Sequence, residues 1–266
     1  MNWTGPFEEA AATLRTTFFT GAGVSAESGV PTFRDQDGFW NRFPPARFAH
    51  WAGLERLIQE EPLLIAEFIS EFVRPIVMAQ PNAAHRAIAD LEKLDKDVTV
   101  VTQNIDGLHQ TAGSSHVVEI HGSLFEVIEV RKSDDIISPV SPQSLSLMLS
   151  DLEALLKNGQ CTTTQLLRAV CPILGVGPEK AHRPNIVLFG DLLPSCAWNE
   201  AVAAASAADC LLVVGTSQLV YPAAGLPALA RSNGAKIIGI GLEDCDCDVL
   251  LIGAAGVTLP RVVSRI

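Results

Sequence analysis

The chain has 266 residues, of which 48% are apolar, and it carries a formal net charge of −11. This length and composition allow a sizeable core, and the acidic balance excludes the broad basic surface that nucleic acids or anionic membranes require. The first residues lack the basic and apolar regions of a secretory signal, and no run of about 18 apolar residues predicts a membrane-spanning helix. The six scattered cysteines are typical of a reduced protein. We therefore expect a cytoplasmic, intracellular protein with neither nucleic-acid nor membrane partners.

Short apolar runs alternate with helical stretches along the chain, which predicts an α/β fold with a parallel sheet. The runs are almost continuously hydrophobic, as expected of strands that are buried on both faces. Such an alternation is typical of a Rossmann-like, doubly wound nucleotide-binding domain. Strands are expected at 14–19, 97–102, 117–120, 185–189, 210–215, 236–240 and 256–259, and helices at 7–13, 54–78 in two pieces, 83–94, 196–208 and 223–232.

Two segments interrupt this alternation, at 41–80 and at 126–182. The second contains a helix at 144–158 with one leucine-rich face, preceded by Ser141-Pro142 as N-cap and first turn and followed by Gly159 as a stop. A shorter helix is expected at 164–170. We interpret the two segments as one smaller, mainly helical module inserted into a Rossmann-like domain that is formed by 1–40, 81–125 and 183–266.

The segment FTGAGVSAESG follows the first predicted strand. Gly21 and Gly23 would let the backbone approach a phosphate closely, and the N-terminus of the next helix would add donors. The pattern departs from the usual GxGxxG fingerprint, so a plain glycine turn is an equal alternative. Arg34, a dozen residues further on, is a bidentate cation suited to a diphosphate or else a surface residue.

Three further motifs follow predicted strands. Gln103, Asn104 and Asp106 in TQNIDGLH could bind a ribose and a carboxamide, or simply cap a helix. His121 in IHGS is suited to proton transfer near neutral pH, although a lone histidine is more often structural. The fourth motif is Val214–Ser217, which places small hydrogen-bonding residues after another apolar strand. All four motifs lie at carboxyl ends of strands of one predicted sheet, where α/β folds bind their ligands.

Taken in order, GAGVSAESGVPTFRD, TQNIDGLH, IHGSLF, NIVLFGD and GTSQLVYPAA resemble the sirtuin family of NAD-dependent protein-lysine deacylases over about residues 16–242. The TFRD and AESG contexts resemble the bacterial and mitochondrial deacylase branch. The resemblance implies that His121 is the general base and that NAD is the cofactor. It implies an extended acyl-lysine peptide pairing with the strand of Val187, Leu188, Phe189 and Gly190. The implied cofactor contacts are Gly21, Ala22, Gly23, Phe33, Arg34, Gln103, Asn104, Asp106, Gly215, Thr216 and Ser217.

The reaction implied by the resemblance is deacylation of lysine. The acyl oxygen attacks C1′ of the ribose as nicotinamide departs, and Asn104 contacts that ribose. His121 then accepts a proton from a ribose hydroxyl, and water finally releases deacylated lysine and O-acyl-ADP-ribose. Phe33 would shield the reactive face after nicotinamide leaves.

The chain departs from the family pattern in its cysteines. Members of the family usually carry two CxxC pairs between the HG motif and NIVLFG, and these pairs hold a structural zinc. Here that interval contains only Cys161 and Cys171, so no zinc is predicted. The leucine-rich helix is expected to supply by apolar burial the stability that zinc gives elsewhere.

Two other departures concern the ligands. The branch that removes succinyl and malonyl groups pairs a Tyr with an Arg three residues apart, whereas this chain has Glu71 and Arg74, so acidic acyl groups are disfavoured. Gly241 stands where the family often has an Asn for the adenosine ribose. These departures leave two alternatives to deacylation open, namely ADP-ribosyl transfer or NAD hydrolysis, and a non-catalytic sensor of NAD or ADP-ribose. The oligomeric state is not predicted.

Overall fold

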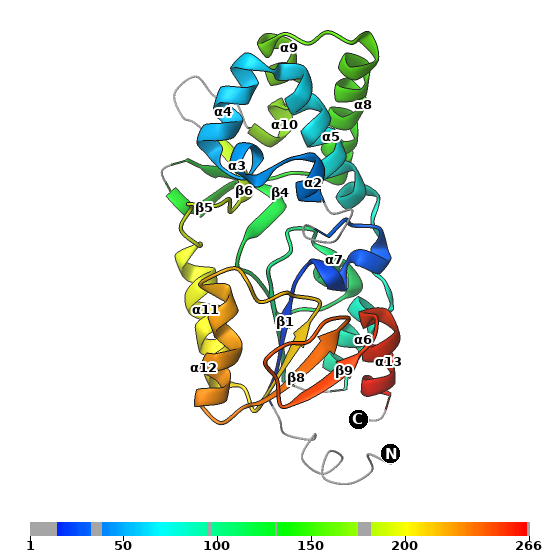
Figure 1. The fold of residues 1–266 in the computed structure, drawn as a ribbon, viewed down its shortest axis with the longest axis vertical. Coiled ribbons are helices and arrows are strands. Elements are labelled where there is room, and N and C mark those ends of the chain that lie inside the picture. Colours follow the sequence, from blue (N-terminus) through cyan, green and yellow to red (C-terminus); the bar gives the residue numbers. More distant parts are fainter. Residues whose placement is uncertain (1–14, 33–38, 95–96, 131, 175–181, 265–266) are drawn as a thin grey trace. The chain divides into compact units, whose positions relative to one another are not determined.

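The computed structural model describes residues 15–32, 39–94, 97–130, 132–174 and 182–264. Its contacts divide the chain into two units, each of which is described by itself (Figure 1). Unit 1 is formed by the described residues within 1–28, 80–120 and 195–266, and unit 2 by those within 29–79 and 121–194. The described residues of the smaller module predicted at 41–80 and 126–182 fall in unit 2, except Gln80, which falls in unit 1.

Unit 1 contains a six-stranded, fully parallel sheet in the order β3-β2-β1-β7-β8-β9. The order reverses between β1 and β7, which makes this pair the topological switch point of the sheet. Thr20 pairs with both Thr102 and Val214, so the carboxyl ends of β1, β2 and β7 are level. The strands are β1 (Thr16–Thr20), β2 (Val98–Thr102), β3 (Val117–Glu119), β7 (Cys210–Val214), β8 (Lys236–Gly241) and β9 (Val249–Ile252).

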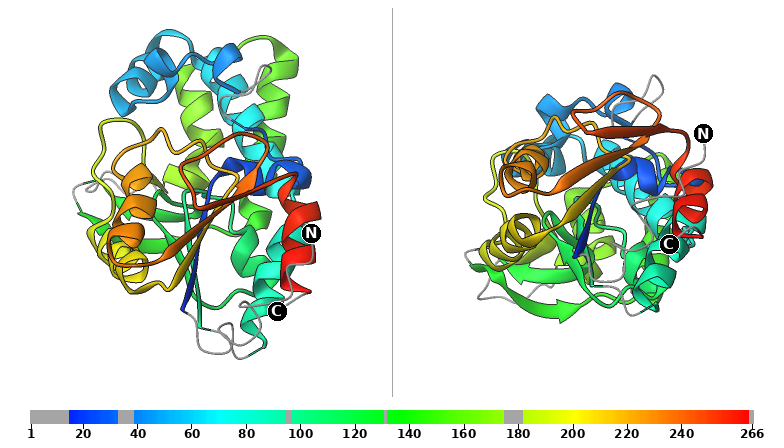
Figure 2. Two further views of the ribbon diagram at one scale, coloured as in Figure 1. Left: turned by 60° about the horizontal axis from the view of Figure 1, so that its bottom comes forward. Right: turned by 90° about the horizontal axis from the view of Figure 1, so that it is seen from below.

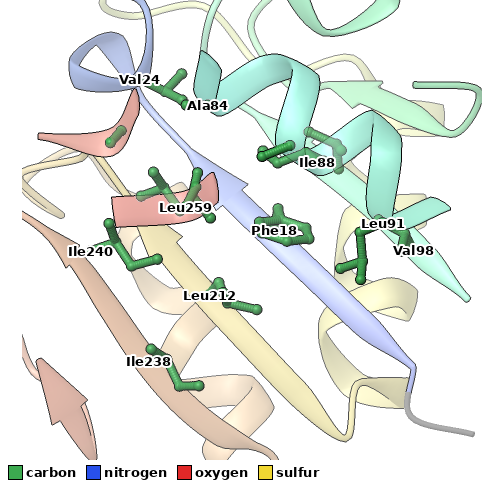
Figure 3. Close-up of a cluster of buried hydrophobic side chains, with 14 of the residues drawn as sticks. Phe18, Val24, Ala84, Ile88, Leu91, Val98, Leu212, Ile238, Ile240 and Leu259 are labelled. Atoms are coloured by element: carbon green, nitrogen blue, oxygen red, sulfur yellow. The ribbon is translucent and has the colours of Figure 1, made fainter. Parts of the chain in front are cut away.

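Helices cover both faces of this sheet because each strand presents apolar side chains on both sides (Figure 2). On one face Phe18, Leu212 and Ile238 pack against α6 and α13 (Figure 3). On the other face Phe19 and Leu211 pack against α11 and α12. The helices of unit 1 are η1 (Ala22–Val24), η2 (Ala26–Ser28), α6 (Ala83–Glu92), α7 (Leu108–Ala112), α11 (Ser195–Ala207), η3 (Ala223–Gly225), α12 (Leu226–Ser232) and α13 (Ala255–Val263).

Unit 2 combines helices with a three-stranded antiparallel sheet in the order β5-β4-β6, which the sequence analysis did not predict. The strands are β4 (Gly122–Glu129), β5 (Lys132–Pro139) and β6 (His182–Ile186). The helices are α2 (Phe39–Arg42), α3 (Pro45–Phe48), α4 (Trp51–Glu60), α5 (Pro62–Met78), α8 (Pro142–Asn158), α9 (Thr163–Ala169) and α10 (Cys171–Leu174).

The core of unit 2 is apolar and rich in aromatic rings. Helix α8 is the predicted leucine-rich helix: the Ser141 hydroxyl accepts from Ser144 N at 3.1 Å, and Gly159 ends the helix in the left-handed region. Its buried face packs on α5, and five phenylalanine rings cluster beside it with centroids about 5–6 Å apart. These residues are Leu145, Met148, Leu149 and Leu152 on α8, and Phe39, Phe43, Phe48, Phe68 and Phe72.

Two predicted strands are wrong. Residues 256–259 belong to helix α13, where Ala255 and Leu259 lie one turn apart and pack into the core beside α6. The run expected at 185–189 is a strand only to Ile186, and it belongs to the antiparallel sheet of unit 2 rather than to the parallel sheet. The helix predicted at 7–13 lies outside the described residues.

Candidate functional site

The loops that follow β1 and β7 pack tightly at the switch point of unit 1. Gly21 N donates to Val214 O at 3.1 Å and Gly23 N to Gly215 O at 2.8 Å. A Cβ on Gly21 would lie 2.8 Å from Thr216 Cβ, and one on Gly23 would lie 2.8 Å from Gly215 Cα. Glycine is therefore required here by the neighbouring loop, independently of any phosphate.

The residues after β2 join the same edge of the sheet. Gln103 N donates to Thr20 O at 3.0 Å, and its side-chain Nε2 donates to Thr216 Oγ1 at 2.9 Å. Gly215, Thr216 and Gln103 therefore come together across the switch point, as the motif positions predict. Ser217 lies next to them in the chain and is exposed.

A buried polar cluster lies beside these loops. The Ser25 hydroxyl donates to Asp106 Oδ2 at 2.6 Å, and Asn104 Nδ2 donates to Ser25 Oγ at 3.0 Å and to Gly21 O at 3.2 Å. Ser25 is fully buried, and Asn104 and Asp106 are 9% and 5% exposed. Burial raises the pKa of Asp106, and the hydrogen bonds from Ser25 and from Leu108 N offset part of that rise.

Two buried histidines complete the cluster. His85 Nε2 lies 3.4 Å from Ser25 Oγ, and its Nδ1 accepts from Asn82 N, so we assign the proton to Nε2. His109 Nε2 lies 3.1 Å from Thr20 Oγ1, and the two rings meet edge to face at 4.8 Å. Burial lowers the pKa of His85 to about 4 and that of His109 to about 3, so both rings are neutral at pH 7.

The neutral histidines predict acid sensitivity. Their pKa values are lower in the folded chain than the ordinary 6.5, so the unfolded chain binds more protons and stability is lost as pH falls below about 6.5. We expect the free energy of unfolding to fall by up to about 1.4 kcal/mol per pH unit for each histidine between pH 6.5 and 5. Urea unfolding at several pH values measures this slope.

A pair of variants tests the assignment. His109→Gln is expected to reduce the slope of the free energy of unfolding against pH, because it removes the contribution of one of the two buried histidines. His116→Gln removes an imidazole whose side chain is 50% exposed, and it serves as the control for a histidine outside the buried pair. A wild-type free energy of unfolding that stays flat from pH 6.5 to 5 would contradict a neutral buried pair.

The predicted base lies on unit 2. His121 is half-buried, and it directly follows Ile120, whose N–H donates to Thr102 O at 3.0 Å. His121 O accepts from Val187 N at 3.0 Å. Gly122 has a φ of +77°, and a Cβ there would collide with Asn185 O, which explains the glycine after His121.

The segment Val187–Gly190 lies beyond the end of β6 and forms a turn. Val187 N donates to His121 O, and Phe189 N donates to Ala49 O at 2.9 Å. Leu188 N donates to Asp191 Oδ2 at 3.2 Å, and Phe189 O lies 2.6 Å from His50 Nδ1. The N–H groups expected to pair with a peptide strand therefore already have partners within unit 2.

The remaining predicted site residues are Ala22, Phe33, Arg34 and Arg74. Arg74 Nη2 lies 2.6 Å from Glu153 Oε1, while Glu71 pairs with Arg42 at 2.6 Å, so each charge near the predicted acyl position has a partner on unit 2. Phe33 and Arg34 lie outside the described residues. Ala22 begins η1, one residue after Gly21.

Sequence reasoning missed Ser25, His85 and His109 as parts of the cluster. Ser25 lies in FTGAGVSAESG, in which the prediction considered only the glycines. His109 lies in TQNIDGLH, in which it considered only the amide and carboxylate side chains. His85 lies 60 residues from the serine it approaches, and its only local signal is the Asn82 capping box at the start of α6.

Within the described ranges, no three His, Cys, Asp or Glu side chains form a group that could hold a metal ion. The absence of zinc stays a prediction. We expect overnight incubation with a chelator to leave the melting temperature unchanged, because apolar packing of α5, α8 and the phenylalanine cluster stabilises unit 2. Elemental analysis should find far less than one zinc per chain; stoichiometric zinc, or a melting temperature lowered by the chelator, would contradict this.

No helix among the described residues combines the length and apolar character needed to cross a membrane.

Comparisons with known proteins agree on one family. The model of the Sir2 family matches residues 21–222. An NAD-dependent protein deacylase of Pyrococcus furiosus is 37% identical over 93% of this chain and 91% of its own. The NAD-dependent protein deacylase of Pseudomonas putida is 38% identical over 92% of this chain and 87% of its own.

Solved structures of the same family are also similar. A complex of a Sir2 homologue with NAD has a TM-score of 0.74 and 32% identity, over 96% of this chain and 90% of its own. A complex of Sir2 with a p53 peptide and NAD⁺ has a TM-score of 0.69 and 27% identity, over 98% of each chain.

Proposed function

Because this chain belongs to the Sir2 family, we propose that it is an NAD-dependent protein-lysine deacylase that releases nicotinamide, deacylated lysine and O-acyl-ADP-ribose. The observation that carries the proposal is the cluster at the switch point, where Gln103, Asn104 and Asp106 meet the glycine loops of β1 and β7. Ligands of open parallel sheets bind at such a position. Unit 1 would then be the NAD-binding domain.

The residues present fit NAD. The edge of the sheet offers amide, hydroxyl and carboxylate groups, which suit ribose hydroxyls and a carboxamide. NAD supplies a ribose carbon whose bond to nicotinamide can break. Asp106, held in place by the Ser25 hydroxyl, would accept a hydrogen bond from the carboxamide N–H. Asn104 and Gln103 would contact the ribose next to nicotinamide.

Asp106 is held in a fixed place before any ligand arrives. Ser25 and Leu108 N each donate to one of its oxygens, and Asn104 fixes Ser25 in turn. A carboxylate oxygen has more than one acceptor site, so Asp106 can still receive a carboxamide N–H. Preorganised groups of this kind avoid reorganisation during the reaction.

His121 would act as general base. An imidazole has an ordinary pKa near neutral pH, which suits the removal of a proton from a ribose hydroxyl. The main chain of His121 is fixed by the bond from Val187 and by the glycine that follows. Simple NAD hydrolysis has less need of such a base, so His121 favours deacylation.

The substrate is proposed to be an acyl-lysine peptide. Binding to Val187–Gly190 as an added strand would require Val187, Leu188 or Phe189 to exchange its present N–H partner. Arg74 is neutralised by Glu153, which leaves a carboxylate-bearing acyl group without an unpaired cation there. We therefore favour a neutral acyl group such as acetyl.

Mass spectrometry of the products tests the proposal. The protein is incubated with NAD, with and without peptides bearing different acyl-lysines. Loss of one acyl mass together with O-acyl-ADP-ribose is the expected result, and the acyl mass names the substrate. Nicotinamide release without peptide, or ADP-ribose added to protein, would replace it by hydrolysis or transfer, and binding of NAD without turnover would indicate a sensor.

A further inference from the structure

The connection between β8 and β9 is unusual for two parallel strands. A parallel crossover normally takes a dozen or more residues and includes a helix. Here Leu242–Asp248 alone joins the strands, and it contains no helix. The short connection passes directly over Gly239 in β8, where Cys245 and Cys247 both reach the strand.

The two thiols converge on one point. A Cβ built on Gly239 would collide with Cys245 Sγ and would lie 3.0 Å from Cys247 Sγ. The absence of a side chain at Gly239 is therefore what makes room for both sulfur atoms. Both cysteines are free and partly exposed, so a small reagent can reach them.

The backbone around the pair is fixed by acidic residues that alternate with the cysteines. Asp246 Oδ2 accepts from Arg231 Nη1 at 2.7 Å, and the chain bends at Asp246. Asp248 Oδ2 accepts from Ile237 N at 2.8 Å, and Asp248 N donates to Ile237 O at 2.8 Å. Asp246 lies between the two cysteines and Asp248 follows Cys247, so both anchors hold the segment that carries the sulfur atoms.

We propose that Cys245 and Cys247 form a reversible dithiol–disulfide site that closes within this connection. Cysteines two residues apart can be bridged only where the backbone bends. The chain bends at Asp246, between the two cysteines, and both sulfur atoms lie within 3.0 Å of the same Cβ position at Gly239. This site is independent of the proposed deacylase reaction.

The oxidant is a low-molecular-weight disulfide. Cys247, as thiolate, attacks one sulfur of the reagent, forms a mixed disulfide and releases one thiolate. Cys245 then attacks the Cys247 sulfur, its proton passes to the departing second thiolate, and two molecules of reduced thiol are released. Burial, together with the neighbouring Cys247 thiol, raises the pKa of Cys245, which makes it the resolving rather than the attacking thiol.

The test uses the full-length protein and 2-hydroxyethyl disulfide, an uncharged reagent that the surrounding aspartates do not repel. After alkylation of the remaining thiols, trypsin releases both cysteines in one peptide, Ile237–Arg261, which contains no other cysteine. We expect this peptide to be unalkylated and two hydrogens lighter than its reduced form, and to be restored by a reductant. Exposed Cys171 serves as the internal control that the reagent has reacted.

Two variants make the result decisive. Cys245→Ser is expected to retain the mixed disulfide at Cys247, and Cys247→Ser to react at least about tenfold more slowly. The proposal is overturned if the wild-type peptide stays fully alkylatable while Cys171 has reacted, or if it retains a stable adduct. Because the readout is a mass, neither outcome depends on whether the protein deacylates lysine.

Discussion

Replacement of His121 by alanine is expected to lower the rate of deacylation by about 10²–10⁴-fold, the range in which a positioned general base contributes. NAD affinity is expected to stay within a few-fold of wild type, because the proposed cofactor contacts lie on unit 1 at Gln103, Asn104 and Asp106. Product formation is followed by mass spectrometry and NAD binding by calorimetry.

The outcome of this experiment separates catalysis from structure. His116→Gln, at an exposed histidine paired with Glu200, serves as the matched control and should retain both activity and binding. Loss of NAD binding, or a large drop in the melting temperature of His121→Ala alone, would mean that His121 is structural and would end its assignment as the base.

Gly215→Ala is expected to be the most destabilising change at the switch point. Gly215 has a φ of +59°, a region that costs an L-residue about 1–2 kcal/mol. A Cβ there would also lie 2.5 Å from Gly23 C and 2.8 Å from Gly23 Cα, so the β1 loop must move away. Together these effects predict a loss of about 2–5 kcal/mol in the free energy of unfolding, measured with urea.

Gly159→Ala separates the cost of the positive φ from the cost of the steric clash. Gly159 has nearly the same φ, +64°, but a Cβ there would meet no atom within 4 Å. We expect it to cost only about 1–2 kcal/mol, the backbone part of the effect. Equal losses in the two variants would show that the β1 and β7 loops do not press against each other as described.

Strands β1, β2, β3, β7 and β8 of the parallel sheet were predictable because they are short apolar runs, whereas the partly exposed β9 was not predicted. The antiparallel sheet of unit 2 was not, since β5 is a polar segment, Lys132–Pro139, whose pairing with β4 has no apolar alternation to reveal it. Residues 256–259, with the β-branched Val257 and Thr258, resemble a strand, but packing against α6 makes them helical. Tertiary contacts decided both cases.

The candidate site was also predictable only in part. Its motifs were visible because each follows an apolar strand, and the register of β1, β2 and β7 brings the first, second and fourth to one edge. The bonds of Ser25 to Asp106 and His85 join residues 81 and 60 positions apart, and no local pattern encodes such a pairing. The engaged N–H groups of Val187 and Phe189 were equally invisible, because their acceptors, His121 O and Ala49 O, lie on other segments.

The central place of β1 has a consequence for how a nascent chain folds. Its two neighbours in the sheet are β2, which ends at Thr102, and β7, which ends at Val214. At about 5–20 residues per second, a ribosome needs about 10–40 s after making β1 before β7 exists. During translation the apolar strand TTFFT therefore lacks its β7 partner, and the backbone N–H and C=O groups of that edge stay unpaired. Such an unpaired edge is prone to aggregation. Folding of this chain should accordingly depend on chaperones more than its final stability suggests.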